Sequence, residues 1–303
     1  LYELFTLGEG NGYTQDDITE TARALTGYNN RQDGGPIYFN PNRFDSGEKT
    51  IFGRTGNWNY DDVINILFEE KSDLISEFIV RKIYKHFVSP DVNNDIINEL
   101  SNYFKDNNFE LEPLYRKLFK SEHFFNSFAS NVLIKSPVDL MVQIEKEFNF
   151  EKPDNFNDNL FNYLRARCSD MGQEILNPVD VAGWQENHDW ISTGTLPMRW
   201  EFSDYLLSRY WIKNKEQFRD YAISIVGIDE TNPIEIVKKI NKYMFCNYEM
   251  MDDELNDALA AFKGDVPDDY FNGGGWTLNE TYAPNQVYAL ILFFVKLPEY
   301  QLK

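Results

Sequence analysis

The chain has 303 residues, a net charge of −20, a hydrophobic fraction of 42% and an aromatic fraction of 16%. The apolar content is sufficient for a packed core and argues against disorder. The negative charge argues against binding to nucleic acids and to anionic membrane surfaces. No apolar run approaches the roughly 18–20 residues that a membrane-spanning helix needs, so we expect no membrane span in this segment.

The first element is an apolar, helix-like run over residues 1–7, which has no capping residue before it. A glycine-rich turn at residues 8–12 follows, and then a helix is predicted over residues 14–27. Thr14 is its N-cap, and Asp17 stands in the position of a capping-box acid. Because the chain begins inside an element, we expect it to be the later part of a longer protein.

Residues 28–58 have a different pattern from the rest of the chain. Short strand patterns occur at residues 37–39 and 50–52, and a turn signal lies between them at residues 45–47. The simplest interpretation is a small β-hairpin inserted between helices, near residues 36–54.

From residue 59 onward the pattern is helical almost throughout, with apolar residues spaced three and four apart. Asn59 and Ser136, the latter followed by proline, are clear start signals. We expect one mainly α, multi-helix domain over residues 1–303 that carries the β insertion. The predicted helices cover residues 59–70, 72–88, 92–105, 112–120, 136–149, 157–176, 195–213, 215–226, 233–244, 252–262 and 284–296.

One irregular segment, residues 177–194, interrupts the helices. Long irregular loops inside compact domains are usually functional or packed by their own side chains. His188 and Asp189 in this loop, with Asp180, are the candidate catalytic residues, because a histidine beside carboxylates can act as a general base. The ordinary alternative is an exposed loop histidine without a catalytic role.

Two indoles, Trp184 and Trp190, flank that histidine and are candidate ligand-binding residues. Aromatic rings on a loop can stack against a sugar or form a contact surface for a protein. A glycan is therefore an expected ligand alongside a protein partner, and carboxylates nearby would suit glycoside hydrolysis.

A second candidate binding surface is basic. Arg81, Lys82 and His86 lie on one predicted helix, and on an acidic protein they could together hold a carboxylate or sulfate group. Ion pairs with internal acids, and a histidine at the boundary of the core, are the alternative interpretation.

Residues 249–269 contain eight Asp and Glu residues but only one Lys. A solvated face is the ordinary interpretation of such a cluster, and a calcium site is the alternative. No other cofactor and no other metal site is indicated, since no CxxC pair or phosphate-binding loop occurs. Cys168 and Cys246 are either two thiols or one disulfide.

An ordered set of segments resembles the bacterial family catalogued as domain of unknown function 1800. The similar segments are residues 4–8, 12–17, 22–27, 45–49, 52–53, 78–88, 134–138, 171–173, 178–184 and 298–302. The resemblance implies an exported bacterial protein that is longer at its N-terminus, and it implies no established reaction. One departure is Phe44, which replaces the histidine of the family's "HD" pair, so any role of that histidine is lost here.

These observations together favour a binding or assembly module at the cell envelope or surface, with a protein partner there. The resemblance implies a place in the periplasm, on the outer membrane or outside the cell. The alternatives are a hydrolase, acting on polysaccharide through the loop at residues 177–194, and a structural subunit of an envelope complex.

Overall fold

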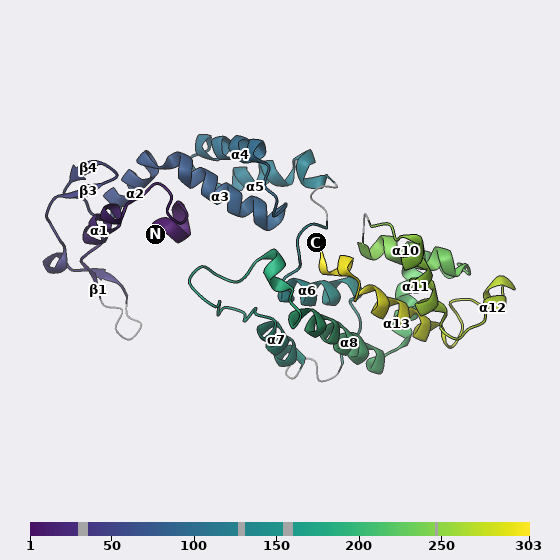
Figure 1. The fold of residues 1–303 in the computed structure, drawn as a ribbon. Coiled ribbons are helices and arrows are strands. Elements are labelled where there is room, and N and C mark those ends of the chain that lie inside the picture. Colours follow the sequence, from purple (N-terminus) through teal and green to yellow (C-terminus); the bar gives the residue numbers. More distant parts are fainter. Residues whose placement is uncertain (30–35, 127–130, 154–159, 246–247) are drawn as a thin grey trace. The chain divides into compact units, whose positions relative to one another are not determined.

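The computed structural model describes residues 1–29, 36–126, 131–153, 160–245 and 248–303 (Figure 1). The described chain is mainly helical with short antiparallel strand pairs, which confirms the expected fold class. It divides into two compact units, Leu1–Phe125 (unit 1) and Asn126–Lys303 (unit 2). The expectation of one domain across the chain stays a prediction, and each unit is considered by itself.

Polar side chains cap the starts of three helices of unit 1, α1, α2 and α4. Thr14 and Asp17 form the predicted reciprocal capping box, and Asn59 forms another with Asp62. In addition to a π-helical turn, η1 (Tyr2–Thr6), and the 3-10 turns η3 (Pro41–Arg43) and η4 (Glu122–Phe125), its helices are α1 (Gln15–Ala24), α2 (Tyr60–Glu70), α3 (Ser72–Phe87), α4 (Asn94–Asp106) and α5 (Leu111–Phe119).

The β insertion is present, but its strands pair differently from the expected hairpin. The strands are β1 (Tyr28–Asn29), β2 (Tyr38–Phe39), β3 (Lys49–Ile51) and β4 (Arg54–Gly56). β2 pairs with β1, and β3 pairs with β4, both antiparallel. The turn between β3 and β4 places Phe52 and Gly53 at positive φ, as a two-residue hairpin requires. Because this tight turn pairs β3 with β4, the two predicted strands do not pair with each other.

Unit 2 contains the other described helices and the irregular loop. Its elements are α6 (Pro137–Phe148), α7 (Phe161–Asp170), η7 (Asn187–Trp190), α8 (Thr195–Lys213), α9 (Glu216–Val226), α10 (Pro233–Phe245), α11 (Asp252–Lys263), α12 (Asp268–Asn272), α13 (Ala283–Phe294) and η8 (Pro298–Gln301). The described part of α7 is shorter than predicted, since the turn at Met171 and Gly172 ends it. The five-residue α12 was not predicted, because it is too short to show a period.

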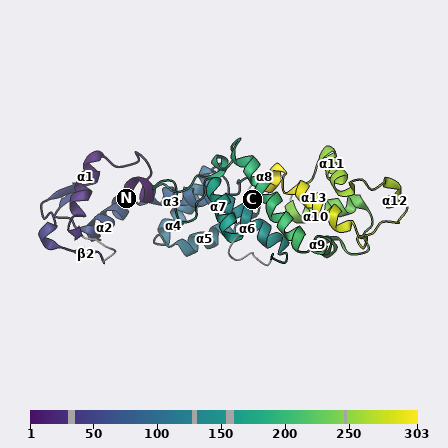
Figure 2. The same ribbon diagram turned by 90° about the horizontal axis from the view of Figure 1, so that it is seen from below.

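The core of unit 2 surrounds α13, which packs against α8, α9 and α11 (Figure 2). Leu290 and Phe294 of this helix are fully buried, as are Phe202 of α8 and Val237 of α10. The longest apolar run of the sequence is therefore a core helix. None of the described helices combines the length and the apolar character that crossing a membrane requires.

The last residues of the chain return to the start of α6. Lys135 donates its backbone N–H to the carbonyl of Gln301 (2.8 Å), and Lys303 donates its own to the carbonyl of Leu133 (2.7 Å). In Figure 1 the yellow C-terminal segment lies beside α6 accordingly. Backbone hydrogen bonds thus join the segments at residues 134–138 and 298–302.

Candidate functional site

Hydrogen bonds within the irregular loop of unit 2 fix its base and its tip. The indole N–H of Trp184 donates to the carbonyl of Glu174 (3.1 Å) across the base of the loop. At its tip the Oδ1 atom of Asp180 accepts the N–H of Ala182 (2.7 Å), and the carbonyl of Asp180 accepts that of Gly183 (3.3 Å). Asp180 therefore stabilises a turn, which is a structural role.

The candidate catalytic residues lie on two parts of the loop, Asp180 in a turn and the other two on η7. His188 and Asp189 are exposed on the short helix η7, and in the part of the chain that the structure describes no hydrogen bond or ion pair joins His188 to Asp189 or Asp180. The neighbouring Asn187 positions η7, because its Oδ1 atom accepts the backbone N–H of Ile134 (2.9 Å).

The two indoles have different environments. Trp184 is half-buried, whereas Trp190 is only 4% exposed and its carbonyl accepts a hydrogen bond from Thr195 (2.9 Å). The ring of Trp190 packs near Gly172 in the interior. This burial leaves little of Trp190 for a ligand to contact.

The loop instead presents aliphatic side chains to solvent. Leu176, Val179 and Val181 are 91%, 74% and 83% exposed. Leu176 also has a positive φ of 64°, a conformation that is unfavourable for a branched side chain. These residues were not among the predicted site residues; the available signal was the presence of aliphatic side chains in an irregular segment, between Glu174 and Trp184, which the indole hydrogen bond joins.

The basic residues on α3 form no common anion site. Arg81 pairs with Glu77 (2.7 Å) and donates to Asn94 (2.8 Å). The ammonium of Lys82 lies over the ring of Phe78, 4.9 Å from its centroid. His86 is exposed and meets a neighbouring phenyl ring edge-on. The charge of Arg81 is therefore used inside unit 1.

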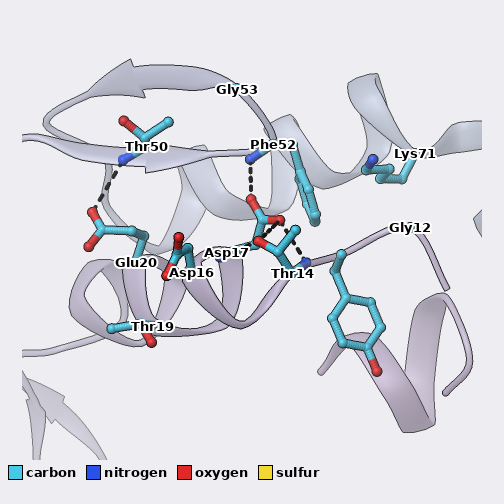
Figure 3. Close-up of a pocket in the computed structure, with 11 residues that line it drawn as sticks. Gly12, Thr14, Asp16, Asp17, Thr19, Glu20, Thr50, Phe52, Gly53 and Lys71 are labelled. Atoms are coloured by element: carbon cyan, nitrogen blue, oxygen red, sulfur yellow. Dashed lines mark hydrogen bonds between the residues drawn. The ribbon is translucent and has the colours of Figure 1, made fainter. Parts of the chain in front are cut away.

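A groove of about 770 Å³ lies between α1 and the β3–β4 hairpin of unit 1 (Figure 3). Its lining combines carboxylates, hydroxyls and two aromatic rings: Gly12, Tyr13, Thr14, Asp16, Asp17, Thr19, Glu20, Thr50, Phe52, Gly53 and Lys71. Figure 3 shows Asp17 and Glu20 pointing from α1 toward β3.

Those two carboxylates join the helix to the hairpin. Asp17 accepts the backbone N–H groups of Thr14 (2.9 Å) and Phe52 (2.7 Å), and Glu20 accepts that of Thr50 (3.2 Å). Desolvation raises the pKa of Asp17, but the hydrogen bonds from Thr14 and Phe52 outweigh it and lower the pKa overall. Asp17 and Glu20 thus hold the fold of unit 1 together.

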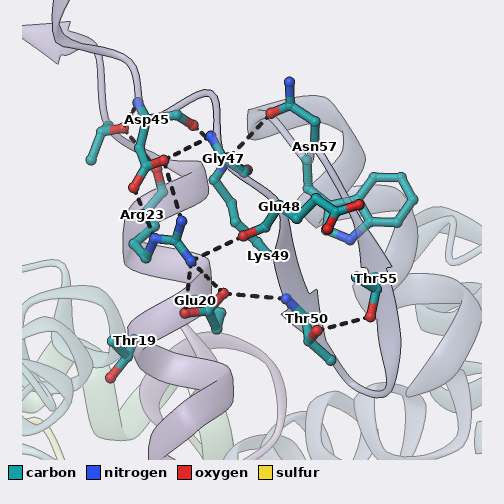
Figure 4. A network of polar contacts seen from close by, with 12 residues as sticks. Thr19, Glu20, Arg23, Asp45, Gly47, Glu48, Lys49, Thr50, Thr55 and Asn57 are labelled. Atoms are coloured by element: carbon teal, nitrogen blue, oxygen red, sulfur yellow. Dashed lines mark hydrogen bonds and ion pairs between the residues drawn. The ribbon is translucent and has the colours of Figure 1, made fainter.

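A second polar network fixes the β insertion (Figure 4). Arg23 pairs with Asp45 (2.8 Å) and with Glu20 (2.7 Å), and the Arg23 hydrogen bond lowers the pKa of Asp45 to about 2. The buried Lys49 ammonium donates to the carbonyls of Asp45 (2.5 Å) and Gly47 (2.9 Å). Burial lowers the pKa of Lys49.

This network explains the segment at residues 45–49. A Cβ atom at Gly47 would lie 2.9 Å from an Arg23 nitrogen, so the close approach requires glycine. The ring of Phe44, where the resemblance has histidine, lies over the Lys49 ammonium at 4.8 Å. The Asp, Gly and Lys of this segment therefore have structural roles, and Asp45 pairs with arginine.

A buried charged cluster in unit 2 was not foreseen from the sequence. The ammonium of Lys135 donates to the carbonyl of Tyr300 (2.5 Å), and Arg199 donates to the Gln301 side chain (2.7 Å) and to the Lys135 carbonyl (2.7 Å). The hydroxyl of Tyr300 in turn donates to Glu147 (3.0 Å). Lys135 and Arg199 occur within a helix start and an ordinary helical pattern, so nothing local marked them as buried.

Burial controls the ionisation of these groups. It lowers the pKa of Lys135 to about 7, against the attraction of Glu147, and lowers that of Arg199 to about 10. It also raises the pKa of Glu147, despite hydrogen bonds from Tyr300 and Gln143. The cluster is an interior network that holds the C-terminal segment.

The remaining predictions concern the two cysteines and a metal site in the acidic stretch. Cys168 is a buried free thiol whose pKa burial raises to about 11, and Cys246 lies outside the described residues. In the acidic stretch at residues 249–269, Lys263 pairs with Asp268 (2.8 Å). Among the described residues, no group of three or more His, Cys, Asp or Glu side chains is arranged to hold a metal ion.

The protein is mainly helical. In each unit, segments that carry the family resemblance take part in a polar network, around Arg23 in unit 1 and around Arg199 in unit 2. The family model for DUF1800, described as a protein of unknown function, matches residues 1–302. The chain therefore belongs to the DUF1800 family. No curated protein and no solved structure matches the chain.

Proposed function

We propose that this protein is a binding or assembly module of the bacterial cell envelope, and that the loop of unit 2 contacts a protein partner there. The observation that carries the proposal is the exposed aliphatic surface of Leu176, Val179 and Val181. A leucine that is almost wholly exposed at positive φ carries two unfavourable features at once. Such features persist where function requires them.

The character of the loop fits a protein partner better than a catalytic site. Covering aliphatic side chains with a partner lowers the free energy. In the described chain no hydrogen bond or ion pair joins His188 to Asp189 or Asp180, so the hydrolase alternative has less support. The loop also carries Asp180, Glu186 and Asp189, so the partner surface would combine an apolar pocket with basic groups at its rim.

Site-specific photo-crosslinking in the source bacterium tests this proposal. A benzophenone amino acid at position 179 or 181 should give one discrete adduct with one envelope protein, identified by mass spectrometry. The same probe at Ile212, an exposed apolar residue of α8 (71% exposed), is the matched control and should give none. The double variant Leu176→Asp, Val181→Asp should lose the adduct formed from position 179, because charged side chains cannot enter an apolar pocket.

An adduct that forms equally from position 212, or that survives the double substitution, would contradict a specific contact at this loop. Export is part of the proposal and is supported by the family resemblance. Cell fractionation of the source bacterium should place the full-length protein outside the cytoplasm, and recovery in the cytoplasmic fraction would exclude an envelope role.

A further inference from the structure

Unit 1 carries a cluster of exposed aromatic rings, which we call the aromatic ridge: Tyr28, Phe39 and Tyr60. Tyr28 and Phe39 stand opposite each other in the β1–β2 register, so their side chains share one face of this ribbon. The ring centroids of Tyr28 and Phe39 are 5.2 Å apart, and those of Tyr28 and Tyr60 are 5.7 Å apart. The three residues are nonetheless 47%, 45% and 47% exposed.

The Phe39 ring of the ridge packs against Gly27 and Phe44. Gly27 lies so close to the ring of Phe39 that an added Cβ would approach it to 2.7 Å, and Gly27 has a positive φ of 90°. The edge of Phe39 also packs against Phe44, with centroids 5.7 Å apart. The glycine that ends the segment at residues 22–27 therefore holds an aromatic ring at the surface.

The ridge is uncharged on a strongly acidic chain. Its three members are two tyrosines and a phenylalanine, while the whole protein has a net charge of −20. The hydroxyls of Tyr28 and Tyr60 make no hydrogen bond within the described chain, which leaves them to donate to and accept from a ligand. The ridge side chains themselves carry no charge, and their phenol groups match a neutral, hydroxyl-rich ligand.

The size of the ridge also favours a slender ligand. If a fully exposed aromatic side chain presents about 200 Å², the three half-exposed residues together present roughly 300 Å². A stable protein partner, or a second copy of the chain, usually covers about 800 Å² on each side. Ile37 and Tyr38 beside the ridge are 64% and 51% exposed, and even with them the apolar surface stays below that area, whereas the ridge matches the apolar faces of two or three sugar rings.

We propose that the aromatic ridge binds a neutral polysaccharide chain. Because the Tyr28 and Tyr60 rings are inclined at 61° to each other, the C–H face of one pyranose ring lies against Tyr28 and that of a neighbouring pyranose ring against Tyr60. The negative faces of the aromatic rings attract polarised C–H groups. The free phenol hydroxyls hydrogen-bond the sugar hydroxyls. This surface is independent of the loop of unit 2, so it gives the protein a glycan contact in one unit whatever the other unit binds.

Affinity electrophoresis of the full chain in native gels tests the proposal, with hydroxyethyl cellulose, xylan, glycol chitin and dextran as neutral probes and polygalacturonate as the anionic probe. We expect at least one neutral polymer to retard the protein and polygalacturonate not to, because like charges repel. Tyr28→Ala with Tyr60→Ala should weaken binding about tenfold or more, since two ring contacts are lost.

Two matched variants separate ring contact from general effects. Tyr28→Phe with Tyr60→Phe keeps the rings and should weaken binding only a few-fold. Tyr243→Ala removes an exposed tyrosine of unit 2 and should leave binding unchanged. If the double alanine variant unfolds, judged by circular dichroism, Tyr60→Ala alone, at the start of α2, replaces it and should weaken binding about threefold or more.

Three results would overturn the proposal. One is the absence of retardation by every neutral polymer, and another is retardation that the alanine variants do not change. The third is a sedimentation experiment in which the ridge variants abolish self-association of the protein, which would make the ridge a contact between copies.

Discussion

At the scale of single residues, the positions that mark the family have identifiable physical roles in this chain. Gly47 allows Arg23 to approach Asp45, and Gly27 makes room for a surface ring. Lys49 supplies an ammonium that carbonyl groups surround. Asp45 and Lys49 would have qualified as candidates for catalysis by residue type alone, and their contacts give them structural roles in the β insertion.

A methyl group at Gly47 tests that interpretation. Gly47→Ala brings a Cβ within 2.9 Å of an Arg23 nitrogen and 3.1 Å of an Asp45 oxygen, so the ion pair must shift. We expect the free energy of unfolding to fall by on the order of 1–2 kcal/mol, measured by urea denaturation. Gly194→Ala is the control, because its Cβ would meet nothing closer than 3.7 Å. Equal stability of both variants would show that the Arg23–Asp45 geometry is not constrained by position 47.

The ionisation of Lys135 makes a distinct prediction for pH. Its folded-state pKa of about 7 lies below the value of 10.5 expected for an unfolded chain, so the unfolded state binds more protons between those values. The stability that depends on Lys135 therefore rises with pH, by about 2 kcal/mol between pH 7 and pH 9.

Lys135→Met should remove this rise, because methionine keeps the apolar stem and has no titrating group. Urea denaturation at several pH values measures the slope, and Lys238→Met, at an exposed position of α10, is the control that should retain the slope of the unsubstituted protein. A slope that Lys135→Met leaves unchanged would assign the pH dependence to other groups.

At the scale of elements, the predictable parts are those with long periods and local signals. The helix expected over residues 195–213 has those bounds in α8, and the starts at Asn59 and Ser136 carry capping boxes. The strand pairs could not be predicted, since two- and three-residue strands carry no usable alternation. The irregular sequence of the loop predicted that it would lie at the surface. Which of its side chains pack inward could not be predicted, because that depends on contacts with distant segments.

The capping box of α6 is an element that can be tested alone. Ser136 accepts the N–H of Asp139 (3.1 Å), and Asp139 accepts the N–H of Ser136 (3.0 Å). Ser136→Ala removes one of these bonds and should lower the free energy of unfolding by about 1 kcal/mol. Ser208→Ala, at a half-buried position of α8 whose hydroxyl donates to the Tyr205 carbonyl of the same helix (2.7 Å), should change it by less than about 0.5 kcal/mol. The comparison requires thermal or urea denaturation of both variants, and a smaller loss for Ser136→Ala than for Ser208→Ala would refute the cap.

At the scale of the whole molecule, each unit has its own apolar clusters. The largest cluster lies in unit 2, around α13, while the cores around Leu67 and Val63 belong to unit 1. Charged residues reinforce each unit separately, with Arg23 at the β insertion and Arg199 at the C-terminal segment. The two chemical surfaces that we propose, the loop and the aromatic ridge, accordingly belong to different units.

Removing the buried guanidinium should therefore have a local effect. Arg199→Met leaves the Gln301 side chain and the Lys135 carbonyl without their donor, at a cost of about 2–4 kcal/mol. Hydrogen–deuterium exchange should show lost protection in α6, α8 and η8, with unchanged protection in α1 and α2. Equal loss in both units would mean that they unfold as one cooperative body.

The phenyl ring at position 44 has a consequence for proton chemistry. It stands 4.8 Å from a buried ammonium, and the neighbouring Asp45 stays ionised because its pKa is about 2. A phenyl ring has no titrating group, so position 44 adds no change of charge to the insertion across the pH range in which histidines titrate.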